Sequence, residues 1–266
     1  MPRRSTWLSI SAVSSICSII FVMSAVSGQR REPAPARVAV LAELFTSEGC
    51  SSCPPADDLL RRLIADQPVE GVEVIAISEH VDYWNRLGWR DPFSSPQFSQ
   101  RQSAYARDLW PDQVYTPQII VDGRARAVGS DWPAVRQLLV EAARAPRATV
   151  TITANRSGRA VSVRVAVRDV PVGLAAGSLQ AIVAIVEDNL LTTVTRGENA
   201  RRQLRHDAVV RHMAPIGNID STTSPAALSA VLDLESSWST EHLRLVVFLQ
   251  DARTHHVVGV AAVRLE

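Results

Sequence analysis

Lysine is absent from this sequence, and all 28 of its strongly basic side chains are arginines. This absence excludes Schiff-base catalysis through lysine and a Walker A phosphate-binding lysine. The formal net charge is only +1, so neither nucleic acid nor an anionic membrane is indicated as a partner. Cysteine is scarce as well, with three residues in the whole chain, and their positions therefore carry much of the information.

Residues 1–27 predict a Sec signal peptide. Arg3-Arg4 form its basic start, residues 7–26 are apolar and uncharged, and residues 25–27 make a small-residue cleavage site. Cys17 lies in the apolar stretch and is removed with it. The alternative is an uncleaved membrane anchor, because the stretch is nearly long enough to span a bilayer. The protein is expected to be periplasmic or secreted, with membrane contact only if this segment stays.

After cleavage the chain keeps 26 basic and 27 acidic residues. Residues 28–37, with their prolines and charges, predict a flexible lead-in. The hydrophobic pattern then changes after Pro146, which predicts one domain over residues 38–147 and a second over residues 148–266.

Short β-rich runs alternate with helical stretches in residues 38–147, which is typical of an α/β unit. Asp122-Gly123 predicts a tight turn between two strands, and Ser130 or Asp131 is a candidate cap for the last helix. The expected elements, in order, are strand Val38–Phe45, helix Asp57–Asp66, strand Val72–Ser78, a helical insertion Phe93–Trp110, strands Gln118–Val121 and Ala125–Val128, and a helix beyond Asp131.

Apolar and polar residues alternate with a period of two in residues 148–266, which predicts an all-β, sandwich-like domain. Expected strands are Thr149–Thr153, Val161–Val167, Leu179–Val186, Ala227–Leu234, Leu243–Gln250 and His256–Leu265. Arg196–Asn199 and the basic run 201–211 are expected on a loop. The loop contacts the first domain or a partner, or it is a solvated arginine-rich face.

Cys50-Ser51-Ser52-Cys53 pairs two thiols where a strand passes into a helix, the geometry of a disulfide that forms and reopens. Cys50, at the helix start, is predicted to be the more exposed nucleophile, with its thiolate stabilised by the helix N-terminus. Cys53 is then the buried resolving thiol. The alternative is a static structural disulfide, as is common in exported proteins.

The element order with the Cys pair before the first helix is the thioredoxin arrangement. The predicted fold is therefore an α/β thioredoxin-like domain with a helical insertion, followed by an all-β sandwich-like domain. In that resemblance, a cis proline before the third strand lies against the disulfide, and the residue before it offers its backbone to a thiol partner. Thr116 and Pro117 take these positions here.

Glu43 is an acidic residue in an otherwise apolar strand. One interpretation is a buried carboxylate of raised pKa that takes the proton from Cys53. The other is an edge-facing glutamate or the partner of an arginine.

His80, Asp82 and Trp84 follow the second strand and are predicted to lie at the same sheet edge as Cys50, where they contact substrate. His80 is also a candidate third ligand beside Cys50 and Cys53 in an alternative copper or zinc site. The structural alternative is a loop histidine held by Asp82 with Trp84 packed beneath it.

The amino-acid sequence of five segments resembles that of the secreted bacterial family catalogued as domain of unknown function 1223. These segments are Glu43–Asp57, His80–Trp84, Gly88–Phe93, Tyr115–Gln118 and Arg196–Asn199. The resemblance implies a thioredoxin-like domain with an appended β domain, and it implies no known reaction.

The sequence thus predicts an exported thiol–disulfide oxidoreductase acting through Cys50 and Cys53 on protein thiols, recycled by an unidentified redox partner, with no cofactor. The alternatives are a periplasmic metal-binding protein or metallochaperone that uses the same cysteines, and a non-enzymatic binding module with a structural disulfide.

Overall fold

The computed structural model describes residues 1–2, 37–111, 113–175, 177–220 and 225–265. Ala36–Glu266 form one compact unit, and Met1–Pro35 are a separate one. Apart from Met1 and Pro2, the expected signal peptide and its cleavage site lie outside the described residues. So do residues 28–36 of the expected lead-in. No helix in the described part of the chain has the length and apolar character needed to cross a membrane.

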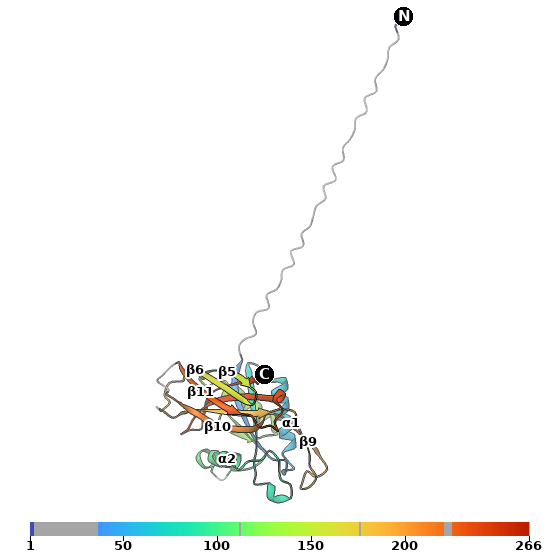
Figure 1. Cartoon of the computed structure of the whole chain (residues 1–266), viewed down its shortest axis with the longest axis vertical. Helices are drawn as coiled ribbons and strands as arrows, with labels where there is room; N and C mark the ends of the chain where they lie inside the picture. The colour runs from blue at the N-terminus through green and yellow to red at the C-terminus, as the bar shows by residue number, and fades with distance from the viewer. Residues whose placement is uncertain (3–36, 112, 176, 221–224, 266) are drawn as a thin grey trace. The chain divides into compact units, whose positions relative to one another are not determined.

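The described residues form thirteen strands and three α-helices (Figure 1). The helices are α1 Pro54–Asp66, α2 Pro96–Leu109 and α3 Trp132–Ala142. The strands are β1 Val38–Thr46, β2 Val72–His80, β3 Gln118–Val121, β4 Ala125–Val128, β5 Thr149–Ser157, β6 Ala160–Arg168, β7 Leu179–Glu187, β8 Leu190–Thr193, β9 Gln203–His206, β10 Val209–Ile219, β11 Ala226–Asp233, β12 Leu243–Asp251 and β13 Val257–Arg264.

Eight of these strands form one mixed sheet in the order β13-β12-β7-β10-β2-β1-β3-β4. Strands β1 and β2 are parallel and are connected by α1, whereas β3 and β4 complete that edge as an antiparallel hairpin. On the other side, β2 joins β10 through the pair Ser78 and Val209, and β7, β12 and β13 follow as antiparallel neighbours. Separate sheets hold β11-β6-β5 and β8-β9.

The predicted fold class is wrong. The elements expected in residues 38–147 are present, but they form no separate α/β thioredoxin-like domain with a helical insertion. Strand β2 is instead followed in the sheet by β10, β7, β12 and β13, four strands from the C-terminal half. The C-terminal strands likewise form no independent sandwich, because β7, β10, β12 and β13 belong to the shared sheet. Periodicity identifies a strand and its buried face, but it carries no information on which distant strand lies beside it.

The predicted division after residue 147 therefore falls inside a region joined by one sheet. Strand β5, immediately beyond that position, pairs with β6 in the three-stranded sheet. The two-domain division remains a prediction, and the site described below draws residues from both halves.

The two faces of the large sheet bury different cores. One face carries Leu41 of β1, Ile77 of β2, Ile182 of β7 and Val246 of β12, with Phe98 of α2 packed in the same cluster. The other face is covered by α1 and α3 over β1 and β2, and by β5 and β6 over β7 and β12. Figure 1 shows α2 on one side of the sheet and β5, β6 and β11 on the other. Side chains that alternate along β1 consequently reach either α1 or α2.

Local chemistry explains the start of the helices that frame the site. Pro54 and Pro55 occupy the first two positions of α1, where an amide N–H would have no partner within the helix. Leu59, Leu60 and Leu63 are spaced to face the core, and all three are buried. Asp131 caps α3 by accepting a hydrogen bond from the backbone N–H of Ala134, as predicted.

The Asp122-Gly123 turn between β3 and β4 is confirmed. Both residues have positive φ, 48° and 61°, which matches the two-residue hairpin turn that the sequence predicts. A Cβ at Gly123 would stand 1.9 Å from the carbonyl oxygen of His255, so only glycine fits. The turn thereby packs directly against the β12–β13 connection.

Candidate functional site

The disulfide lies between β1 and α1. Cys50 and Cys53 are bonded to each other, with their Cα atoms 5.4 Å apart. Cys53 is the N-cap residue of α1, and its carbonyl oxygen accepts from the backbone N–H of Ala56 and of Asp57. Ser52 Oγ lies 3.3 Å from Cys50 Sγ, and because a disulfide sulfur carries no proton, the hydroxyl is the donor. The same hydroxyl is placed to stabilise a Cys50 thiolate after reduction.

Both sulfur-bearing residues are completely buried, so Cys50 is not the more exposed of the two as the sequence predicted. The loop between β8 and β9 covers them. Asn199 donates from Nδ2 to the carbonyl oxygens of Glu48 and Cys50, at 2.9 Å each, and Ser51 donates its backbone N–H to Glu198 at 3.1 Å. We call this loop, residues 194–202, the covering loop, because its hydrogen bonds hold it against the backbone on both sides of Cys50.

Trp84 closes another side of the disulfide loop. A Cβ at Gly49 would stand 3.0 Å from the Cβ of Trp84, so the small residue before Cys50 allows the tryptophan to pack against the backbone. The Trp84 indole Nε1 donates to Thr116 Oγ1 at 2.8 Å. Trp84 thus connects the disulfide loop to Thr116, and its predicted contact with substrate stays a prediction.

The peptide bond between Thr116 and Pro117 is cis, as the resemblance implied. Pro117 lies beside the first turn of α1. A Cβ added to Gly129 would contact both Ala56 of that turn and Pro117, at 3.0 and 3.3 Å. Thr116 and Pro117 therefore belong to the surroundings of the disulfide.

A cluster of buried ionisable side chains lies behind the disulfide. Its members come from the β1–α1 turn, α1, β2, the segment before α2, and β9. We call it the buried polar cluster: Glu48, Asp57, His80, Asp91 and His206, each at most 6% exposed.

The hydrogen bonds of the buried polar cluster connect it to the disulfide turn. Asp91 Oδ2 accepts from the backbone N–H of Glu48 at 2.8 Å and lies 2.7 Å from His80 Nδ1. The Glu48 carboxylate contacts His206 Nε2 at 3.2 Å and accepts from Trp89 Nε1 at 2.8 Å. The His80 and His206 rings meet edge to face, with their centroids 4.8 Å apart.

Asp57 is the member of this cluster nearest to Cys53 along the chain. It lies four residues after Cys53, so the two side chains share one face of α1. Its Oδ1 accepts from the Thr46 hydroxyl at 2.9 Å, and its Oδ2 lies 3.8 Å from His206 Nδ1. Burial raises the pKa of the Asp57 carboxyl, although His206, His80 and the Thr46 hydroxyl each oppose that rise. A carboxyl group that changes protonation nearer to neutral pH suits proton exchange.

His80 and Asp91 form an ion pair within the cluster. Burial lowers the pKa of His80, but Asp91, together with Asp57 and Glu48, outweighs it and the pKa is raised. Burial raises the pKa of Asp91, but His80, together with the backbone N–H groups of Glu48 and Phe93, outweighs it and the pKa is lowered. The charged form of each side chain therefore favours that of the other.

His80 and Asp82 have other partners in the structure than the sequence suggested. His80 is the last residue of β2, fully buried and bonded to Asp91, and it is not a loop residue held by Asp82. Asp82 instead accepts from the Ser99 hydroxyl of α2. His80 supports the buried polar cluster, and Asp82 fastens α2 to the end of β2.

Glu43 is placed on the opposite face of the sheet from Cys53. Its carboxylate accepts from Arg101 at 2.6 and 2.8 Å and from the Tyr105 hydroxyl at 2.6 Å, both on α2. Alternation along β1 directs its neighbours Ala42 and Leu44 toward α1 instead. The structure thus has the arginine-paired arrangement of the second interpretation, and it does not bring Glu43 to Cys53.

The alternative metal site is not assembled. In the disulfide, the Cys50 and Cys53 sulfurs have no thiolate to offer, and Nδ1 of His80 is engaged by Asp91. Among the residues that the structure describes, no group of three or more His, Cys, Asp or Glu side chains is placed to hold a metal ion.

Three important members of the site were missed from the sequence: Asp57, Asn199 and His206. Asp57 has a visible signal, because its spacing from Cys53 places both on one helical face. Asn199 belongs to the segment singled out as a contact for the first half of the chain, although the roles of its amide hydrogens were not foreseen. His206 stands 156 positions after Cys50 along the printed sequence and has no local signal.

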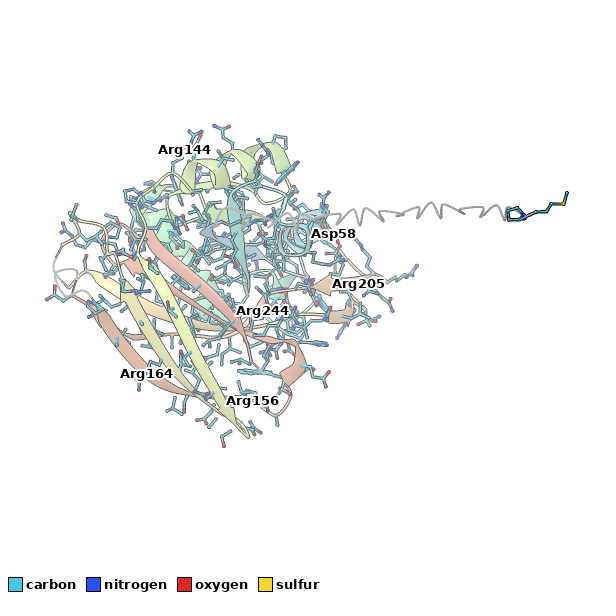
Figure 2. All side chains as sticks on the ribbon, turned by 90° about the horizontal axis from the view of Figure 1, so that it is seen from above. Asp58, Arg144, Arg156, Arg164, Arg205 and Arg244 are labelled. Atoms are coloured by element: carbon cyan, nitrogen blue, oxygen red, sulfur yellow. A yellow bond between two sulfur atoms is a disulfide. The ribbon has the colours of Figure 1, made fainter. Side chains whose placement is uncertain are left out.

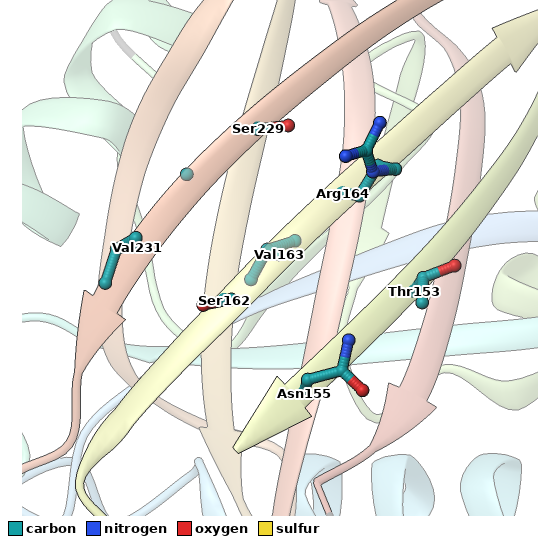
Figure 3. Close-up of a pocket in the computed structure, with 8 residues that line it drawn as sticks. Thr153, Asn155, Ser162, Val163, Arg164, Ser229 and Val231 are labelled. Atoms are coloured by element: carbon teal, nitrogen blue, oxygen red, sulfur yellow. The ribbon is translucent and has the colours of Figure 1, made fainter. Parts of the chain in front are cut away.

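A different hollow lies on the three-stranded sheet (Figure 3). This pocket of about 440 Å³ is lined by Thr153, Asn155, Ser162, Val163, Arg164, Ser229, Ala230 and Val231 from β5, β6 and β11. It contains none of the sequence-predicted site residues, and we assign it no role.

Comparison with known proteins gives the family. The chain matches the model described as "Protein of unknown function (DUF1223)" over residues 41–250 and belongs to this family. A crystal structure of an Agrobacterium tumefaciens protein from a structural genomics consortium is similar, with 28% identity and a TM-score of 0.66 over 87% of this chain and 96% of that one. No curated protein matches the chain.

Two more distant solved structures cover 46% of this chain each. The match to a domain of the outer membrane lipoprotein Omp28 from Porphyromonas gingivalis spans 89% of that chain, at 13% identity and a TM-score of 0.30. The match to a hypothetical protein from Pyrococcus horikoshii spans 90% of that chain, at 13% identity and a TM-score of 0.25. These likenesses are too weak to inform the site.

Proposed function

We propose that the protein is an exported thiol–disulfide oxidoreductase that exchanges electrons with protein thiols through Cys50 and Cys53. The observation that carries the proposal is the disulfide at the start of α1 with the buried polar cluster behind it. A purely structural disulfide needs no ionisable group beside it, whereas thiol–disulfide exchange requires a group that takes up and releases a proton. Export is supported by the predicted signal peptide and suits a stable disulfide.

Reduction proceeds by two exchange steps. A thiolate of the reductant attacks Cys50 Sγ, the Cys50–Cys53 bond breaks, and Cys53 leaves with the electron pair. Asp57, in its acid form, gives its proton to the Cys53 thiolate. A second thiolate of the same reductant then attacks the mixed disulfide and releases Cys50 as a thiolate, stabilised by the Ser52 hydroxyl. The reductant leaves as a disulfide, so two electrons have passed to the protein.

Oxidation is the reverse sequence. Cys50 thiolate attacks a disulfide of the substrate, the substrate S–S bond breaks, one of its sulfurs leaves as a thiolate, and the other is held in a mixed disulfide with Cys50. The Asp57 carboxylate then takes the proton of Cys53, whose sulfur attacks Cys50 Sγ, closes the bond and releases the substrate thiolate. Asp57 takes the role that one sequence interpretation gave to Glu43.

An exchange assay tests this proposal. The purified protein is expected to accelerate exchange between glutathione and a disulfide-bonded test protein, and Cys50→Ser is expected to return the rate to the uncatalysed value because the nucleophile is gone. Cys53→Ser is expected to accumulate a mixed disulfide on Cys50, seen by mass spectrometry. Equal rates with wild type and Cys50→Ser would show that the disulfide takes no part in exchange.

The covering loop gives a separate prediction. Asn199→Ala removes two hydrogen bonds, each worth about 0.5–1.5 kcal/mol, that hold residues 194–202 over the disulfide. Reduction by dithiothreitol is therefore expected to become roughly tenfold faster, as measured by alkylation of the released thiols.

Glu198→Gln is the matched control for this experiment. The amide of this variant keeps a side-chain oxygen for the Ser51 N–H, so its rate is expected to equal that of wild type. If Asn199→Ala also reduces at the wild-type rate, the loop does not limit access to Cys50.

A further inference from the structure

A small pocket opens beside the disulfide, between α1 and β9. It has a volume of about 200 Å³ and is lined by Pro54, Asp57, Asp58, Arg61, Arg202, Gln203, Leu204 and Arg205. Pro54 directly follows Cys53 in the chain, which places the pocket at the start of α1. A neighbouring hollow shares Asp58 and Arg61 and adds Pro55 and Arg62. Figure 2 shows Asp58 and Arg205 at this side of the molecule, with Arg164 well away from them.

The charge of this surface is positive. Arg61 is paired with Asp58 at 2.7 Å and lies 3.6 Å from Asp207, which balances it. Arg62, Arg202 and Arg205 are exposed, and none of them forms an ion pair with a carboxylate among the described residues. We call these three the arginine rim. Buried arginines of the same chain behave differently: Arg101 and Arg147 each bind a carboxylate.

One arginine of the rim is hydrogen-bonded to Asn199 of the covering loop. Arg202 Nη1 donates to Asn199 Oδ1 at 2.8 Å, and Asn199 in turn donates to the carbonyl oxygen of Cys50. The other N–H groups of the Arg202 guanidinium are left for a carboxylate. The rim is thus connected through Asn199 to the backbone of Cys50.

We infer that the arginine rim docks an acidic segment, rich in Asp or Glu, of the protein whose thiol or disulfide reacts at Cys50. This inference rests on the proposed function and specifies the partner that it requires. Guanidinium groups bind carboxylates in a planar, bidentate manner. Positive charge at the rim of a reactive site also attracts an oppositely charged partner and raises the rate of encounter, and salt weakens that effect.

The test compares peptides that differ only in charge. Each carries one cysteine as a mixed disulfide with glutathione, flanked by several Asp, Ser or Arg residues. The acidic peptide is expected to react at least about tenfold faster than the basic one at about 0.01 M ionic strength. This preference is expected to disappear at about 1 M, where the Debye length is about 3 Å.

Charge reversal identifies the surface. The double variant Arg62→Glu/Arg205→Glu is expected to invert the preference toward the basic peptide. The control is Arg164→Glu/Arg168→Glu, two exposed arginines of β6, which is expected to keep the wild-type ratio. All four positions are exposed, so both doubles are expected to fold, and thermal unfolding confirms it.

A cysteine-free acidic peptide separates this inference from the proposed function. Its binding to wild type, followed by fluorescence anisotropy, is expected to weaken in Arg62→Glu/Arg205→Glu. Exchange without charge preference, or a preference unchanged by the reversal, would overturn the docking surface and leave the redox function standing. Binding of the cysteine-free peptide at the rim without exchange of any peptide would overturn the redox function instead.

Discussion

Replacing Asp57 by asparagine is expected to slow closure of the Cys50–Cys53 disulfide about 100-fold at neutral pH, the smaller end of the range for general base catalysis. The reaction to follow is oxidation of the reduced protein by glutathione disulfide, quenched in acid and analysed by mass spectrometry. A mixed disulfide with glutathione is expected to accumulate in Asp57→Asn, because Cys53 then has no carboxylate to take its proton.

The pH dependence distinguishes this role from a structural one. Asp57 acts as a base only when ionised, and burial raises its pKa. Closure in the wild type is therefore expected to accelerate as pH rises through that pKa and then to level off. In Asp57→Asn this inflection is expected to vanish, leaving only the rise from ionisation of the Cys53 thiol at alkaline pH.

Two further variants complete the Asp57 experiment. Asp66→Asn changes an exposed carboxylate at the end of the same helix and is expected to leave closure unchanged. Thr46→Val removes the hydroxyl that lowers the pKa of Asp57, so the inflection is expected to move to higher pH. A wild-type closure rate and profile in Asp57→Asn would show that the Cys53 proton leaves by another route.

The pH dependence of disulfide closure is affected by every charged group that faces Asp57. These groups come from β2, the segment before α2, β9, the β1–α1 turn and the pocket wall: His80, Asp91, His206, Glu48, Asp58, Arg61, Arg202 and Arg205. His80 and His206 lower the pKa of Asp57 and Asp91 raises it. Oxidation is therefore measured over a pH range wide enough to include the protonation of His80, whose pKa is raised.

Arg101→Met is expected to destabilise the protein by about 3–5 kcal/mol, because two buried carboxylates lose their cation. Arg101 of α2 donates to Glu43 and lies 3.4 Å from Glu79, and both glutamates are fully buried. Burial raises the pKa of Glu79 well above its ordinary range, and Arg101 opposes that rise. The midpoint of thermal unfolding is expected to fall by roughly 10 °C or more.

Acid is expected to reduce the defect of Arg101→Met. Without the arginine, the pKa of Glu79 rises further, and a group with a raised folded pKa contributes stability that is lost as pH rises through it. Arg101→Met is therefore expected to regain stability relative to wild type as pH falls. Arg107→Met, on an exposed part of α2, is the control and is expected to unfold at the wild-type temperature. An Arg101→Met protein as stable as wild type would mean that Glu43 and Glu79 need no cation.

Local parts of this fold were predictable because hydrophobic spacing and turn chemistry are local properties. Strands β3 and β4 were predicted at their observed bounds, and the Asp122-Gly123 turn and the Asp131 cap follow from residue type. Strands β9 and β10 were missed because arginines and histidines interrupt their apolar alternation. The pairing of β10 with β2 joins residues about 130 positions apart, and no sequence period specifies such a contact.

The candidate site was likewise predictable only in part from the sequence. The Cys50–Cys53 pair, Trp84, Thr116 and Pro117 were recognised from spacing and resemblance, and the structure gathers them around the disulfide. The burial of Cys53 was predicted, but that of Cys50 was not foreseen, because the covering loop comes from the distant β8–β9 connection. Glu43 was recognised as unusual, but the face of β1 that it occupies depends on α2 packing against it.

Redox titration of the Cys50–Cys53 pair distinguishes a reactive disulfide from a structural one. The protein is equilibrated in glutathione and dithiothreitol buffers of graded potential, and its free thiols are trapped with an alkylating reagent that shifts its mass. We expect one reversible two-electron transition between about −120 and −270 mV, the range of exchange catalysts. A disulfide that stays closed well below about −300 mV would be a structural bond and would contradict the proposed function.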